Sequence, residues 1–176
     1  MQDNWINSYP LLLVSEGSEL NISPTEPGGA SIFGVSVTAL SDLRKSRGLP
    51  PATVDDIKNL TAADVEDFYK SVTAKACRFD DLPKGVDYRA LDIFTNLGPT
   101  GGAWCLQIAL GMWPLANTIT DDVMSEVGKV APEVLIVALG AAWLSKKHES
   151  SGWPQSGHGW TNRANRVTQD AAAMLK

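Results

Sequence analysis

Apolar residues recur at helical spacing over most of the chain, which predicts a mainly α-helical protein. The first such stretch, residues 5–16, runs from a tryptophan to a glutamate and contains Pro10. Because proline is tolerated in the first turn of a helix, we expect the regular helix to begin near Tyr9 with Ser8 as its cap, or to be kinked there. Gly17 follows as the expected C-terminal stop.

A glycine-rich segment, residues 21–34, interrupts the helical pattern. Glycine reaches positive φ at no steric cost, so a segment of this kind favours tight turns and close backbone approaches. The short apolar run at residues 30–37 then predicts one small β-hairpin. The fold class expected from these patterns is mainly α with a minor β element.

Helical periodicity resumes after the hairpin and continues to the end of the chain. Thr53 and Thr61 each stand three residues before an aspartate, which is the arrangement of a capping box at a helix start. The other expected helices span residues 38–47, 88–97, 102–112, 121–128, 132–148 and 162–175. Between the last two, the glycines and serines of residues 150–159 predict a loop.

A chain of 176 residues folds as one domain or as two small lobes. The polar connection at residues 79–85 is the best candidate boundary, so we expect a lobe at 1–84 and a helical lobe at 85–176 that share one core. Residues 134–144 are apolar on every side, and such a helix is stable only where neighbours cover all its faces. This run is too short to cross a bilayer, which takes about 20 residues, so we expect no membrane insertion.

Charge and composition narrow the function classes. The chain carries 15 Lys+Arg against 20 Asp+Glu, a net charge of −5, and 44% hydrophobic residues, which argues against disorder and against a nucleic-acid partner. Cys77 and Cys105 fit neither a zinc site nor a disulfide framework; we expect buried thiols, and a bridge between them stays open. His148 and His158 lack partners at metal-ligand spacing, so we expect surface histidines and no metal. No basic segment opens the chain, so we expect no signal peptide.

The most informative local feature is a glutamate-glycine pair followed by a glycine-rich turn. Glu16 would lie in the last turn of the first helix beside leucines, where a carboxyl group keeps its proton more readily. The turn with Gly28, Gly29 and Gly34 would let the backbone approach a bulky substrate. This combination suits glycoside hydrolysis, in which a protonated carboxyl group donates to the leaving oxygen. The simpler alternative is that Glu16 is a solvated residue at a helix end.

Motifs along most of the chain favour the first interpretation. Glu16-Gly17 with Gly28, Gly29 and Gly34 resembles the N-terminal signature of glycoside hydrolase family 108, the lysozyme-like N-acetylmuramidases found among phage endolysins and secretion-linked bacterial muramidases. Four further motifs carry the similarity onward: Asp81-Leu82-Pro83-x-Gly85, Asp92-x-x-x-Asn96-x-Gly98, Leu106-Gln107-x-Ala109-Leu110-Gly111 and Gly159-Trp160-x-Asn162-Arg163.

The resemblance implies a lysozyme-like muramidase that acts on bacterial peptidoglycan, with Glu16 as the general acid. Ser31 and Glu26 are implied to position water or to support the oxocarbenium-like transition state. The residues implied in substrate binding are Gly28, Gly29, Asp92 and Asn96. For Asn96, a cap on the helix before Gly98 is an equally good reading. No metal or organic cofactor is implied, and we expect a monomer.

Two other functions stay open at this point. A lytic transglycosylase would use the same glutamate, with the 6-hydroxyl of the sugar as the nucleophile. A non-catalytic peptidoglycan-binding or phage structural protein would keep the fold; Ser18 and Glu19, which stand where the family has glycine and an aromatic residue, favour it. The segment 85–176 resembles one often described as peptidoglycan-binding. A phage endolysin would be made in the host cytoplasm and act in the periplasm or cell wall.

Overall fold

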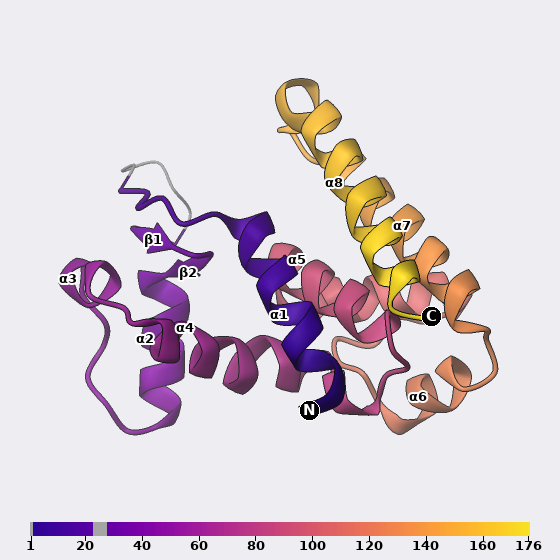
Figure 1. The fold of residues 1–176 in the computed structure, drawn as a ribbon, viewed down its shortest axis with the longest axis horizontal. Coiled ribbons are helices and arrows are strands. Elements are labelled where there is room, and N and C mark those ends of the chain that lie inside the picture. Colours follow the sequence, from indigo (N-terminus) through magenta and orange to yellow (C-terminus); the bar gives the residue numbers. More distant parts are fainter. Residues whose placement is uncertain (1, 23–27) are drawn as a thin grey trace. The chain divides into compact units, whose positions relative to one another are not determined.

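The computed structural model describes residues 2–22 and 28–176, and its ribbon is drawn in Figure 1. These residues form eight α-helices, two short helical turns and one small antiparallel hairpin, which confirms the expected mainly helical, lysozyme-like fold. The chain divides into two compact units. One is the continuous segment Trp5–Thr73, and the other joins the residues up to Asn4 with Ala74–Lys176.

The unit Trp5–Thr73 ends earlier in the chain than the predicted boundary at residue 84. The connection that marked that boundary forms a 3₁₀ turn, η2 (Phe79–Asp81), which packs on the first helix of the helical unit. The elements of Trp5–Thr73 are most of α1 (Gln2–Glu16), β1 (Ser31–Ile32), β2 (Val35–Ser36), α2 (Val37–Ser46), α3 (Val54–Lys58), α4 (Ala62–Tyr69) and most of the π-helical turn η1 (Lys70–Ala74).

Helix α1 begins well before the predicted start at Tyr9 and passes through Pro10 without ending there. The helix starts early because tertiary contacts hold the residues ahead of the proline. Asn4 contacts the helical unit, and Trp5 contacts the unit Trp5–Thr73. Trp5 is buried and its indole Nε1 donates to Glu66 Oε1 at 2.9 Å. Asn4 is also buried, and its amide donates to both oxygens of Asp87 at 2.7 Å.

The predicted β-hairpin is present and closes through a two-residue turn. Ser31 pairs with Ser36, and Ile32 pairs with Val35. The turn residues Phe33 and Gly34 have φ values of 51° and 75°. Positive φ at both positions is the requirement of a type I′ turn, whose twist matches that of the two strands.

The predicted helix starts at Thr53 and Thr61 are confirmed, each with a complete capping box. In each case the threonine side chain accepts from the backbone of an aspartate, and that aspartate accepts in return from the threonine N–H. Ser36 caps α2 in a similar way by accepting from the Ala39 N–H at 3.2 Å. Caps are local interactions, which is why the sequence alone locates these helix starts.

The second unit is built from helices around a shared core. Its elements are η2, α5 (Val86–Ala109), α6 (Asp121–Val127), α7 (Pro132–His148) and α8 (Trp153–Ala173). Helix α5 is broken at Gly98, where φ is 69° and ψ is 177°, and Pro99 follows. The two segments on either side of this break correspond to the two helices predicted there.

Helix α7 is the predicted central helix, but it is not covered on every face. It packs against α5 and α8, and Leu139 and Trp143 are fully enclosed. Val134 and Val137 lie on the opposite face and are 57% and 61% exposed. The burial predicted from the all-apolar sequence is therefore greater than the burial in the structure, where one face of the helix is exposed. No single helix in the described ranges is long and apolar enough to cross a membrane; α6 and α7 meet that test only as a pair bent by 120°.

The predicted loop at residues 150–159 is wrong, because α8 begins at Trp153 and runs through that segment. Pro154 suits the first turn of a helix. Gly157 leaves room for the Trp153 ring, since a Cβ there would lie 2.8 Å from it. The same ring packs on Trp160 and His148, with centroids 6.1 and 4.8 Å away. These contacts hold a glycine-rich sequence in a helix.

Cys77 and Cys105 are both buried, as predicted, and both are free thiols. Burial raises the pKa of Cys105 to about 11 and that of Cys77 further. The bridge that the sequence left open is not formed.

Candidate active site

Glu16 ends helix α1, as the sequence predicts. Leu12, one turn earlier, is completely buried, and Glu16 itself is half-buried. Gly17 adopts a φ of 74° and its N–H donates to the Leu13 carbonyl at 3.0 Å, which closes the helix end. The carboxyl group therefore projects from a fixed helix end next to apolar packing.

The tip of the hairpin lies against the Glu16 carboxyl group. A Cβ atom placed on Gly34 would be 2.8 Å from Glu16 Oε2 and 3.1 Å from its Cγ. It would also overlap the Tyr69 hydroxyl. Only a residue without a side chain fits between these two groups, so the positive φ and the close approach both require glycine at position 34.

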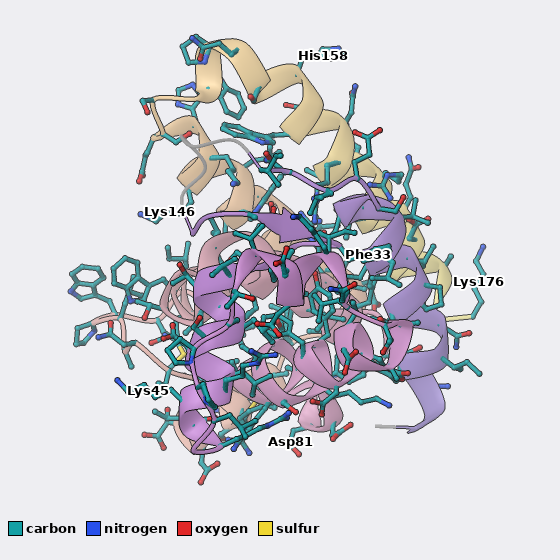
Figure 2. All side chains as sticks on the ribbon, turned by 90° about the vertical axis from the view of Figure 1, so that its left-hand side faces the viewer. Phe33, Lys45, Asp81, Lys146, His158 and Lys176 are labelled. Atoms are coloured by element: carbon teal, nitrogen blue, oxygen red, sulfur yellow. The ribbon has the colours of Figure 1, made fainter. Side chains whose placement is uncertain are left out.

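Tyr69 is the residue of this site that sequence analysis did not single out. It ends α4, immediately before the π-helical turn η1, a type of irregularity that is frequent at functional sites. Its hydroxyl donates to the Phe33 carbonyl at 2.7 Å. Phe33 lies on the hairpin (Figure 2). The sequence places Tyr69 only on the apolar face of a helix and carries no signal for a partner 36 residues earlier.

The glycine turn ahead of the hairpin has the predicted positive φ, 94° at Gly28 and 77° at Gly29. Gly28 accepts from the Thr38 N–H at 3.1 Å, and a Cβ on it would come within 3.0 Å of Ser36 Oγ. Ser31 is half-buried, and its backbone pairs with Asn21 as well as with β2. Their roles in the reaction and in substrate binding stay predictions. Glu26 lies outside the described residues, so its role also stays a prediction.

Asp92 and Asn96 belong to the helical unit. Asp92 is completely buried, and Arg163 donates to its Oδ1 from Nε at 3.0 Å and from Nη2 at 2.7 Å. The carboxylate is enclosed and ion-paired within the helical unit, and its role in substrate binding stays a prediction. Asn96 is half-buried, and its amide donates to the Asp92 carbonyl at 3.1 Å just before the break at Gly98. That contact fits the capping interpretation of Asn96.

Within the described ranges, no three His, Cys, Asp or Glu side chains group closely enough to hold a metal ion.

The fold and this site define a class, that of lysozyme-like glycoside hydrolases. The family model of glycosyl hydrolase 108 matches residues 9–98, more than half of the chain. The chain therefore belongs to the glycosyl hydrolase 108 family, and this membership supports a peptidoglycan hydrolase. The matched residues include the whole candidate site and extend into α5.

Among solved structures, the chain is similar to SagA of Brucella abortus, with a TM-score of 0.86 and 27% sequence identity. The similarity covers 99% of this chain and 97% of SagA, so it includes the part of the helical unit that lies beyond the family match. No protein with curated annotation matches the chain.

Proposed function

We propose that the protein hydrolyses the β-1,4 bond between N-acetylmuramic acid and N-acetylglucosamine in bacterial peptidoglycan, with Glu16 as the general acid. One observation carries the choice of residue: the Glu16 carboxyl group ends α1 half-buried and lies against a turn in which only glycine fits. Family membership supports the substrate class.

In this proposal Glu16 donates its proton to the glycosidic oxygen while the bond from that oxygen to the anomeric carbon breaks. Positive charge develops on the sugar ring as an oxocarbenium-like transition state. Water then adds to the anomeric carbon and gives up a proton, which leaves a new reducing end and restores the acid. Ser31 and Glu26 are the residues proposed to position this water.

The test compares Glu16→Gln with the unchanged protein on purified peptidoglycan. Glutamine keeps the shape of the side chain but has no proton to transfer, so the rate of wall lysis should fall about 10²–10⁴-fold. Glu19→Gln is the matched control, because Glu19 is exposed and lies three residues after Glu16, beyond the end of the helix. Lysis by Glu16→Gln at the rate of the control would remove Glu16 from the reaction.

Product mass separates hydrolysis from the transglycosylase alternative. Hydrolysis adds one water to each cleaved bond, whereas attack by the 6-hydroxyl of the sugar leaves an anhydro ring and adds none. Mass spectrometry of the released fragments should therefore show reducing-end muropeptides. Anhydromuramyl ends would show that the protein is a transglycosylase, in which Glu16 still acts as the acid but no water is added. Inactivity of the unchanged protein would favour the non-catalytic alternative.

A further inference from the structure

Tyr69 has a polar group in an otherwise apolar position beside the proposed acid. The residue is 1% exposed. Its ring packs edge-on against Phe68, with centroids 5.5 Å apart, and tilts against Tyr9 at 6.1 Å. These contacts fix the ring, so the hydroxyl has a defined position that does not depend on its own hydrogen bond.

The hydroxyl holds a backbone conformation that is unfavourable on its own. It donates to the Phe33 carbonyl at 2.7 Å, and Phe33 has a φ of 51°. Residues with a large side chain rarely adopt positive φ, and such conformations persist where surrounding contacts enforce them. The bond from Tyr69 is a contact of this kind.

The turn that Tyr69 holds is the surface on which the Glu16 carboxyl group rests. Gly34 lies against both side chains, so closely that one added carbon would meet the Tyr69 hydroxyl and Glu16 Oε2. A shift of the turn would therefore change the surroundings and the position of the carboxyl group.

We infer that Tyr69 is a positioning residue for the proposed general acid: through its bond to Phe33 it holds the hairpin turn, and the turn holds the Glu16 carboxyl group in place for proton transfer. This inference rests on the proposed function. In this scheme Tyr69 acts through the turn and transfers no proton itself. Because proton transfer depends steeply on geometry, loss of the hydroxyl should slow the chemical step more than it weakens binding.

The test is Tyr69→Phe, which removes the hydroxyl and keeps the ring. Initial rates on soluble peptidoglycan oligomers should show kcat reduced about tenfold or more, with KM within about twofold of the original. Rates are expressed per folded molecule, with the folded fraction taken from circular dichroism. Tyr88→Phe is the matched control, because Tyr88 is a fully buried tyrosine of the helical unit, and it should leave kcat unchanged.

A second pair of variants tests the turn without altering Tyr69. Gly34→Ala inserts a methyl group between the Tyr69 hydroxyl and Glu16, whereas Gly48→Ala places alanine at a similar φ, 71°, with no atom within 4 Å. Both variants place a Cβ atom on a backbone of similar positive φ. Only Gly34→Ala should lower kcat per folded molecule, by at least as much as Tyr69→Phe.

The outcomes separate this inference from the proposed function. If Glu16→Gln is inactive and Tyr69→Phe keeps the original kcat, the inference is overturned and the proposed function stands. It is also overturned if Tyr69→Phe loses folded protein but not rate per folded molecule, which is the signature of a structural role. If Glu16→Gln is as active as the unchanged protein, the proposed function fails, and the inference fails with it. A selective fall in kcat for Tyr69→Phe and Gly34→Ala, with both controls unaffected, supports it.

Discussion

Arg163 donates two hydrogen bonds to a single oxygen of Asp92, although the two residues are 71 positions apart in the chain. The bond from Nε is 3.0 Å and that from Nη2 is 2.7 Å. Asp92 is completely buried on α5, and Arg163 lies on α8. The pair therefore joins two helices through a charge that has no access to water.

Arg163→Met should destabilise the protein by about 3 kcal/mol, because removal of one partner leaves a buried carboxylate without its main counter-charge. The free energy of unfolding is obtained from urea denaturation. Lys129→Met is the control, since Lys129 pairs with Glu126 at the surface and its loss should change stability by less than about 0.5 kcal/mol. Equal effects of the two variants would contradict a structural role for the buried pair.

Arg89→Met, in contrast, should leave the free energy of unfolding unchanged or raise it. The Arg89 guanidinium is fully buried, and its nitrogens have no hydrogen-bond partner among the described residues. Its nearest opposite charge is Asp92, with Nη1 and Oδ2 3.7 Å apart, and burial lowers the pKa of Arg89. Replacing a poorly satisfied buried charge by an apolar chain is often neutral or stabilising. The urea midpoint should therefore stay the same or rise. A decrease in the free energy of unfolding of more than about 2 kcal/mol would show that Arg89 is needed to balance the charge of Asp92.

Two substitutions on α7 test the one-sided burial of that helix. Leu139→Asp would place an unpaired carboxylate in the core, at a cost of several kcal/mol against a total stability of about 5–15 kcal/mol. Val137→Asp makes a similar change on the exposed face and should cost less than about 1 kcal/mol. Circular dichroism should show Leu139→Asp unfolded and Val137→Asp folded. Similar melting curves for both would mean that the exposed face is covered in solution.

The Arg44–Asp56 pair should make stability depend on pH at the acid end. Arg44 donates to both oxygens of Asp56, at 2.9 and 2.8 Å, and together with Thr53 it holds the pKa of Asp56 well below its usual range. The stabilisation is complete above the pKa of an aspartate in the unfolded chain, about 3.9, and is lost as pH falls below that value. Asp56→Asn should therefore lower the urea midpoint at pH 7 and lower it less at pH 3.

The control for this pH dependence is Asp55→Asn. The Asp55 side chain is 81% exposed and forms a surface ion pair with Lys58 three residues later. Its replacement should change the midpoint little at either pH. A gap between Asp56→Asn and the unchanged protein that is equally wide at pH 7 and pH 3 would contradict an electrostatic origin.

Features that depend on a few neighbouring residues could be predicted from the sequence. The capping boxes at Thr53 and Thr61, the hairpin and the end of α1 at Glu16 are all of this kind, because each is decided within four residues of chain. The glycine that Glu16 needs beside it could also be predicted, since a family motif contains Gly34.

Features that depend on distant contacts could not be predicted in this way. The bond from Tyr69 to Phe33 joins two elements that have no common sequence pattern. Gln107 is a further example, because the motif that contains it gives no reason for a buried amide. In the structure its side chain bonds the N–H and the carbonyl of Ala116, both at 2.7 Å, and so fixes the chain beyond α5.

The division of the chain at Asn4 and at Thr73 makes the segment with Glu16 an insertion within the helical unit. The helical unit is discontinuous in the sequence, because its first residues are separated from the rest of it by the whole of Trp5–Thr73. A peptide fused ahead of Asn4 would therefore adjoin the neighbourhood of Asp87 in the helical unit. For the same reason, moving the helical unit into another protein requires two separate sequence segments. The segment Trp5–Thr73 can instead be moved as one continuous piece, with both of its ends joined to the recipient protein.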